Sequence, residues 1–300
     1  MLPDELERLA ARYVPGSGSL NIVRLSNGLV NDTYRVSRDG NSYALRVAAP
    51  NTSDLGLDRH WEARVLERAV PAGLAPAMEY CDPSHGILIS RWSSGRSWNA
   101  QDARRDLNVG RIAELLRRIH ALSMPATPRV MSPMKWIGFY TTAAAKLGPP
   151  REGLQAGNAA ALKSAAERRM AELAFGPQVP AVVCHSDLHI LNLIDSGQSL
   201  VLLDWEYAHA ADPFWDLAGW SGNNDYENAL MEQLLVSYCA RPPTRDERRR
   251  LRLLSWLYDY VCLLWCELVA APGGTARDGV AARAGHLAGR LLATASSRGG

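Results

Sequence analysis

The sequence predicts an α+β protein with a small strand-rich N-terminal lobe and a larger helical C-terminal lobe. Two observations favour this fold class. Short runs of β-branched, aliphatic and aromatic residues, separated by turn sequences, fill much of the first 92 residues, whereas amphipathic helical patterns dominate afterwards. We therefore expect two domains, covering residues 1–92 and residues 93–300.

The N-terminal region contains five strand-like runs and two helical patterns. The first helix is expected over residues 3–14, before the turn pair Pro15-Gly16, and the second over residues 57–70. The strand-like runs cover residues 20–25, 33–36, 43–47, 78–81 and 86–91. Tight-turn residues join the first three runs, which indicates an antiparallel meander.

The C-terminal region reads mainly as helices. Residues 102–122 carry a strong amphipathic pattern, and residues 158–174 form a second one, with Asn158 as its expected N-cap. Between residues 181 and 203, two short apolar runs flank a polar loop, and helices dominate again from residue 224.

Composition excludes several classes of function. The net charge is +2 and no dense basic stripe occurs, so we expect no nucleic-acid partner. The longest apolar stretch contains Arg252, Asp259 and Glu267, which argues against a membrane span. The N-terminus lacks a signal-peptide core and the five cysteines form no CxxC pair, so a reducing cytoplasm is expected. The sequence gives no indication of oligomeric state.

The polar loop carries the residues best suited to chemistry. It contains Asp187 and Asn192, and Asp204 follows at the end of the apolar run 200–203. Phosphoryl transfer requires a carboxylate to orient the attacking hydroxyl and oxygen ligands to hold Mg²⁺ against the phosphates. Asp187 fits the catalytic role, and Asn192 and Asp204 fit the metal-binding role.

The two histidines of the loop allow a different interpretation. His185 and His189 are four residues apart and could form a zinc pair, but no HExxH sequence surrounds them and no third ligand is evident. We expect His185 to be a hydrogen-bonded structural residue of the loop.

The spacing of Asp187, Asn192 and Asp204 resembles that of the protein-kinase catalytic loop and metal-binding Asp. The His-x-Asp form of the loop and the segment 212–218 resemble the aminoglycoside phosphotransferase and choline kinase superfamily. The resemblance implies a protein-kinase-like two-lobed fold, an N-terminal nucleotide-binding lobe, and the use of ATP and Mg²⁺. It also implies that Asp216 braces the catalytic loop.

The N-terminal lobe offers candidates for nucleotide binding. Residues Asn27, Gly28 and Asn31 lie where a phosphate-covering loop is expected, although no GxGxxG or Walker A sequence occurs. The loop is similar to the small-residue loop of choline kinases. A hairpin glycine needs no ligand, so this signal is weak by itself.

The strand 43–47 places Arg46 where protein kinases carry a phosphate-binding Lys, and Glu62 is its expected ion-pair partner. The competing interpretation is a surface Arg on an edge strand. The family resemblance further implies that the backbone from Ser90 to Trp92 pairs with adenine.

The acceptor is less well defined. Glu206 follows the metal-binding Asp in a segment that looks closest to choline, ethanolamine and thiamine kinases, and Trp256, Tyr260 and Trp265 could bind a quaternary ammonium through cation–π attraction. The same aromatic stripe could be ordinary helix core. Choline is the first expectation, and the alternatives are thiamine, an aminoglycoside, or a non-catalytic pseudokinase scaffold.

Overall fold

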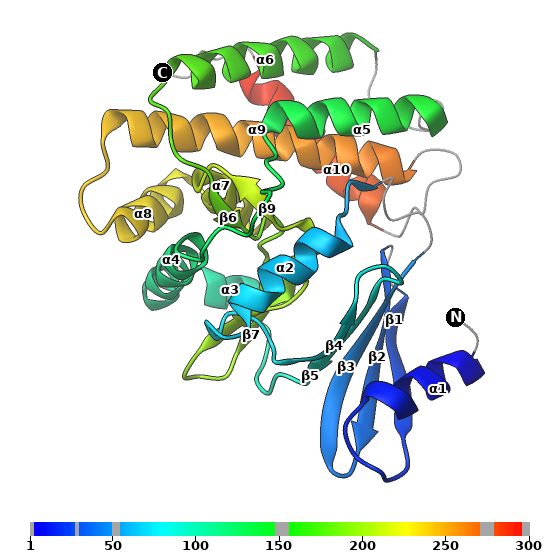
Figure 1. Ribbon diagram of the computed structural model, residues 1–300. Helices are drawn as coiled ribbons and strands as arrows, with labels where there is room; N and C mark the ends of the chain where they lie inside the picture. Colours follow the sequence, from blue (N-terminus) through cyan, green and yellow to red (C-terminus); the bar gives the residue numbers. More distant parts are fainter. Residues whose placement is uncertain (1–2, 28–29, 50–54, 148–155, 271–278, 296–300) are drawn as a thin grey trace. The chain divides into compact units, whose positions relative to one another are not determined.

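The computed structural model describes residues 3–27, 30–49, 55–147, 156–270 and 279–295 (Figure 1). The chain forms two compact units. The first unit comprises Met1–Trp98 and Leu191–Ala208, and the second comprises Asn99–Ile190 and His209–Gly300. The first unit thus ends six residues after the expected domain boundary and also takes a segment from the middle of the chain.

The first unit is built around a five-stranded antiparallel sheet with the strand order β1-β2-β3-β5-β4. Its elements are α1 (Pro3–Tyr13), β1 (Asn21–Asn27), β2 (Asn31–Arg38), β3 (Asn41–Ala48), α2 (Arg59–Ala69), β4 (Met78–Asp82), β5 (Ile87–Arg91), β7 (Leu193–Asp195), β8 (Leu200–Leu202) and the 3₁₀ turn η3 (Trp205–Tyr207). The predicted meander of three strands is present. The α+β fold class, with a strand-rich N-terminal region and a helical C-terminal region, is confirmed.

The alternation of side chains along β3 separates the core of this sheet from its functional face. Tyr43, Leu45 and Val47 are buried and pack in a cluster that includes the apolar side of α1. Because successive residues of a strand point to opposite faces, Ala44 and Arg46 point the other way, and both line a cavity. The period-2 pattern of one strand therefore decides which side chains are available for binding.

The second unit is helical. Its elements are α3 (Ala100–Ala103), α4 (Asp106–His120), α5 (Pro133–Leu147), α6 (Ala156–Phe175), β6 (Val182–Cys184), β9 (His209–Ala211), α7 (Phe214–Asn223), α8 (Asn228–Cys239), α9 (Arg245–Ala270) and α10 (Val280–Thr294). The long helix α9 lies at the centre and packs against α5, α6, α7 and α10 (Figure 1).

Four details differ from the sequence-based expectation. The expected helix over 102–122 is interrupted between α3 and α4, because Asn99 and Asp102 form a capping box that begins a separate short helix. Leu107, counted there as apolar face, is 78% exposed. Asn158 lies inside α6 and is not its N-cap. The helices α5 and α7 were not anticipated.

Helix α9 is long and apolar enough to meet the composition test for a membrane span, and it is the one helix in the described ranges that does so. However, 61% of its most apolar window is buried against the rest of the protein. Buried positions include Leu254, Leu257 and Val261. These features are those of a core helix.

A close approach between α7 and α9 fixes the centre of the second unit. A Cβ atom at Gly219 would lie 3.0–3.2 Å from three atoms of the Tyr258 ring. Tyr258 is buried, and its hydroxyl accepts a hydrogen bond from Asn223 Nδ2 at 3.0 Å, so the ring has little freedom to move away. Glycine is therefore required at this crossing.

Comparison of two helical glycines tests this packing. The change Gly219→Ala should lower the free energy of unfolding by about 1–3 kcal/mol because the new methyl group overlaps the Tyr258 ring. Gly110→Ala, in α4, meets no atom within 4 Å and should raise stability by up to about 1 kcal/mol through helix propensity. Thermal melting of the two variants measures both effects. A Gly219→Ala variant as stable as Gly110→Ala would contradict the packing argument.

Candidate active site

A cavity of about 200 Å³ opens on the functional face of the first unit. Six of the residues that the sequence singled out for nucleotide or metal binding line it: Asn31, Arg46, Glu62, Ser90, Asn192 and Asp204. They come from β2, β3, α2, β5 and the ends of the β7–β8 hairpin. Folding thus gathers side chains up to 173 positions apart in sequence (residues 31 and 204) around one space.

Arg46 is the central cation of this cavity. Its guanidinium forms ion pairs with Glu62 at 2.6 Å and with Asp204 at 2.9 Å, and its side chain is 12% exposed. The predicted ion pair with Glu62 is present. The competing interpretation of a surface Arg on an edge strand is wrong, because β3 lies in the middle of the sheet.

A second buried arginine completes the network and was missed from the sequence. Arg59 Nη1 lies 3.0 Å from Glu62 Oε2 and 2.8 Å from Glu206 Oε2, while its Nη2 donates to Asn31 Oδ1 at 2.7 Å. Asn31 Nδ2 in turn donates to Glu206 Oε2 at 2.6 Å. The available signal was the i,i+3 spacing of Arg59 and Glu62 on the predicted helix.

The metal-ligand candidates lie on adjoining segments. The Leu203 amide donates to the Asn192 carbonyl at 2.8 Å, which extends the hairpin pairing to the position next to Asp204. Asp204 has a left-handed backbone with φ +60°, a conformation that Asp tolerates better than most residues. Its side chain is 33% exposed, whereas those of Glu62 and Glu206 are 3% and 4% exposed. Asp204 is therefore the most accessible carboxylate of the group.

The charges of this network are unequal. Three carboxylates (Glu62, Asp204, Glu206) surround two guanidinium groups (Arg46, Arg59), so full ionisation leaves one excess negative charge. Burial, and then the charge of Asp204, raise the pKa of Glu206 to about 7, although both arginines oppose the rise. Oxygen donors with excess negative charge suit a hard divalent cation such as Mg²⁺. The residues present therefore fit the metal that the sequence implied.

The remaining nucleotide candidates differ in their environment. Ser90 lines the cavity, whereas the Trp92 ring is 38% exposed and lies under the Arg35 guanidinium, 4.7 Å from its centroid. The Arg91 and Trp92 amides already donate to Ala77 O and Ser42 O, so adenine pairing in this stretch would need other backbone groups. Asn27 ends β1, and Gly28 lies outside the described residues.

The catalytic-loop candidate Asp187 belongs to the second unit, where the Asp216 carboxylate holds its loop through hydrogen bonds. The two oxygens of this carboxylate accept the His185 amide at 2.9 Å and the Ser186 amide at 2.7 Å. Ser186 is held with φ +70°, a strained conformation for a non-glycine residue. The loop shape therefore depends on a side chain 30 residues further along the chain.

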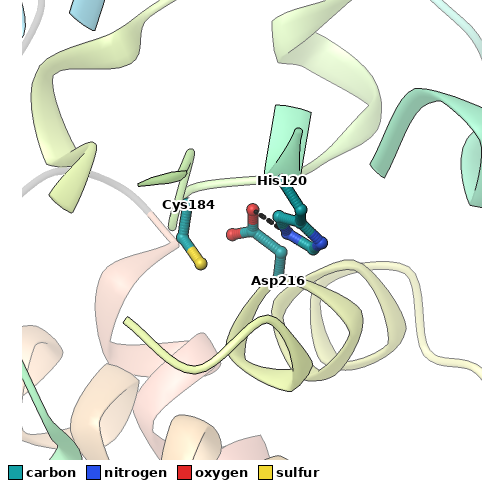
Figure 2. A group of neighbouring side chains, drawn as sticks. All are labelled: His120, Cys184 and Asp216. Atoms are coloured by element: carbon teal, nitrogen blue, oxygen red, sulfur yellow. Dashed lines mark hydrogen bonds and ion pairs between the residues drawn. The ribbon is translucent and has the colours of Figure 1, made fainter. Parts of the chain in front are cut away.

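Asp216 has a further partner on another helix. His120 Nε2, on α4, lies 3.2 Å from Asp216 Oδ2 (Figure 2). The other ring nitrogen, His120 Nδ1, lies 2.8 Å from the Tyr238 hydroxyl. Burial raises the pKa of Asp216, but the hydrogen bond from His120 and the loop contacts outweigh it and lower the pKa below its ordinary value. His120 was not anticipated as a support of this loop.

His120, Cys184 and Asp216 bring three possible ligand atoms within 4.8 Å of one another (Figure 2). Each atom already has a protein partner, because the Cys184 thiol donates to Asp212 O and the other two groups bond as described. Burial raises the pKa of Cys184 well above its usual value, which keeps the thiol protonated. The cluster fits a hydrogen-bonded brace better than a metal site.

Asp187 itself is partly accessible, with 32% of its side chain exposed, and His189 Nε2 lies 3.6 Å from its Oδ2. Burial opposes ionisation, yet the contact with His189 and the charges of His185 and Arg283 lower the pKa of Asp187 below its usual value. The carboxylate is therefore ionised at neutral pH and able to accept a hydrogen bond. The His185 Nδ1 accepts the Asp187 amide at 3.3 Å, in keeping with its expected structural role.

The aromatic candidates for the acceptor lie on α9. Trp256 and Tyr260 share one face with ring centroids 5.6 Å apart, and both are at least 90% buried. The Arg169 guanidinium covers one face of Trp256 at 4.2 Å, so that face is not open to a substrate cation. Trp265 is half-buried further along the helix. Their assignment to the acceptor stays a prediction.

Sequence and structure comparisons place the chain among known proteins. The sequence model described as "Phosphotransferase enzyme family" matches residues 21–254, which is more than half of the chain. No curated protein sequence matches the chain.

Several solved structures have the same fold. A choline/ethanolamine kinase family protein from Mesorhizobium loti is 24% identical, with 99% of this chain and 96% of that chain covered and a TM-score of 0.78. Choline kinase LicA from Streptococcus pneumoniae, also solved with AMP, is 23% identical, with 97% and 98% covered and a TM-score of 0.77. A microcompartment-associated aminopropanol kinase is 18% identical, with 97% and 96% covered and a TM-score of 0.70. At these identities, the similarity establishes the fold and leaves the substrate open.

The raised pKa of Glu206 makes a prediction about stability. Because the folded state raises this pKa from 4.5 to about 7, protonated Glu206 stabilises the fold, and this contribution is complete below pH 4.5 and lost as pH rises toward 7. Urea unfolding of the wild type and Glu206→Gln at several pH values should show the wild type losing up to about 3 kcal/mol relative to the variant across this range. A difference that stays flat or grows in the wild type's favour would contradict the raised pKa.

Proposed function

Because the chain belongs to the phosphotransferase enzyme family, we propose that it transfers the γ-phosphoryl group of ATP to a hydroxyl of a small amine-bearing metabolite, with Mg²⁺ as cofactor. The observation that carries this proposal is the cavity of the first unit, where the buried cation Arg46 and the oxygen donors Asn192 and Asp204 line one space. A nucleotide triphosphate with its metal needs both kinds of group together.

The residues of the first unit bind and position the nucleotide. Asn192 and Asp204 would hold Mg²⁺ through their side-chain oxygens, and the ion would supply positive charge that stabilises the phosphates. Arg46 steadies the phosphates and is itself oriented by Glu62 at 2.6 Å. Arg59 and Asn31 fix Glu206, so the acidic side of the cavity stays in one arrangement.

The loop of the second unit handles the acceptor. Asp187 accepts a hydrogen bond from the acceptor hydroxyl and takes its proton as the hydroxyl oxygen forms a bond to the γ-phosphorus. The bond between that phosphorus and the leaving ADP oxygen breaks at the same centre, and the products are ADP and a phosphate ester. Asp216, held by His120, keeps the loop backbone in the strained shape that presents Asp187.

The choice of acceptor class rests on the comparisons. Two of the similar structures are a choline kinase and an aminopropanol kinase, which makes an amino alcohol the first acceptor class to test, with choline as the specific candidate. We also propose a cytoplasmic location, which the use of ATP and the five free cysteines support.

The catalytic assignment is tested by conservative substitutions. Asp187→Asn should lower kcat by about 10²–10⁴-fold because the proton acceptor is lost. Asp204→Asn should cause a loss of at least about 10²-fold that excess Mg²⁺ partly reverses, and Asn tolerates the left-handed backbone at this position. ADP release with choline, ethanolamine, thiamine and an aminoglycoside panel supplies the measurement.

The matched control is Asp246→Asn, which removes an exposed carboxylate near the start of α9 and should leave turnover unchanged. Melting temperatures of all three variants report folding. Full ADP production by folded Asp187→Asn or Asp204→Asn would overturn the assignment.

A further inference from the structure

A single arginine of α10 lies close to the catalytic loop of the second unit. Arg283 is exposed, and its Nη2 donates to Asn223 Oδ1 at 2.8 Å. Asn223 ends α7, immediately after the close crossing of α7 with α9. Neither residue was singled out from the sequence, because they are sixty positions apart and no short motif joins them.

Asn223 ties this arginine to the loop. Its Nδ2 donates to the Leu188 carbonyl at 3.0 Å, and Leu188 is the residue directly after Asp187. The same Nδ2 donates to the Tyr258 hydroxyl at 3.0 Å, and that hydroxyl donates to the Ser186 carbonyl at 3.4 Å. The loop residues on both sides of Asp187 are therefore bonded to groups that also position Arg283.

The charge of Arg283 is not balanced by a close carboxylate among the residues that the structure describes. Across the described ranges of the chain, no Asp or Glu oxygen lies within ion-pair distance of its guanidinium, and its hydrogen bond goes to a neutral amide. Arg290, on the same helix, provides the contrast. It lies 2.6 Å from Asp259 Oδ1 and 3.4 Å from Asp225 Oδ1, so its charge is balanced within the protein.

Three titratable groups near Arg283, namely Cys262, Cys266 and Tyr258, are neutral. Burial raises the pKa of Cys262 to about 12 and that of Cys266 to about 11, and it raises the pKa of Tyr258 well above its usual value. Asp187 is a charged group that interacts with Arg283, since each of the two charges stabilises the other. The charge of Arg283 also acts to lower the pKa of Asp259, but the Asp259 carboxylate is already bonded to Arg290. An exposed guanidinium is thus linked through Asn223 to the residue directly after the expected proton acceptor, and it can bind another anion.

We propose that Arg283 selects acceptors that carry a carboxylate next to the reacting hydroxyl, so that the substrate is a hydroxy amino acid rather than a simple amino alcohol. This inference rests on the proposed function, because it takes Asp187 as the residue that receives the hydroxyl. A guanidinium binds a carboxylate through two parallel hydrogen bonds, and the same charge repels a quaternary ammonium such as choline. Arg283 is thus a specificity-determining residue, and the product is the phosphate ester of the hydroxy acid.

The effect of the carboxylate is measured with pairs of acceptors that differ only in that group. Serine is ethanolamine with one added carboxylate, and threonine bears the same relation to 1-amino-2-propanol. With the full chain, ATP and Mg²⁺, kcat/KM should be at least about tenfold higher for the carboxylated member of a pair. Arg283→Gln should bring the two members to within about twofold, mainly through the acceptor KM, while the KM for ATP stays unchanged. Arg283→Lys, which keeps the charge, should restore part of the preference.

The control Arg252→Gln removes an exposed arginine of α9 and should preserve the preference. Binding is measured separately by titrating the Asp187→Asn chain with serine and ethanolamine, with and without Arg283→Gln. Preference for ethanolamine or choline, persistence of the serine preference in Arg283→Gln, or absence of binding by both carboxylated probes would each overturn the inference.

These readouts distinguish the two proposals. ADP release with amino alcohols but not with serine or threonine overturns the role of Arg283 and leaves the phosphotransferase reaction standing. Serine binding that depends on Arg283, without ADP release by the wild type with any acceptor, supports the anion site and overturns the proposed reaction.

Discussion

The first unit depends on the burial of two guanidinium groups and on the negative charge that surrounds them. Arg46 and Arg59 are 12% and 10% exposed, and an unpaired charge at such depth costs several kcal/mol. Three carboxylates and the Asn31 amide provide the compensation, and they come from four different elements. The position of α2 against the sheet and the end of the β7–β8 hairpin is therefore constrained by electrostatics as well as by apolar packing.

The same balance of charges makes the cavity suitable for a cation. One carboxylate more than the two arginines require is present, and burial together with the charge of Asp204 raises the pKa of Glu206. Asp204, the most accessible of the three, remains available at the cavity wall. A stabilising network that is slightly too acidic is a suitable environment for a divalent cation and the phosphates it accompanies.

In the second unit, by contrast, the surrounding groups keep one carboxylate, that of Asp187, ionised on a strained loop. Asp216 accepts two consecutive backbone amides and the ring of His120, so the loop has little freedom to relax. Asn223 and Tyr258 bond to the loop carbonyls on either side of Asp187. Arg283 bonds to Asn223 and adds a positive charge to this part of the second unit, and under our proposal this charge binds the acceptor.

The sequence by itself determined the fold class and the strand-rich N-terminal region, because these depend on local periodicity. Short spacings and the family resemblance made Asp187, Asn192 and Asp204 the candidate site residues. The resemblance to protein kinases, which carry a Lys at the position of Arg46, also predicted the ion pair of Arg46 with Glu62. Only the tertiary structure decided that Arg59 and Asn31 fix Glu206, that Arg169 covers Trp256, and that Arg283 stands beside the loop. The physical reason is that each of these contacts joins residues 60 to 175 positions apart. Their meeting is set by helix packing and burial rather than by any pattern that a short stretch of sequence contains.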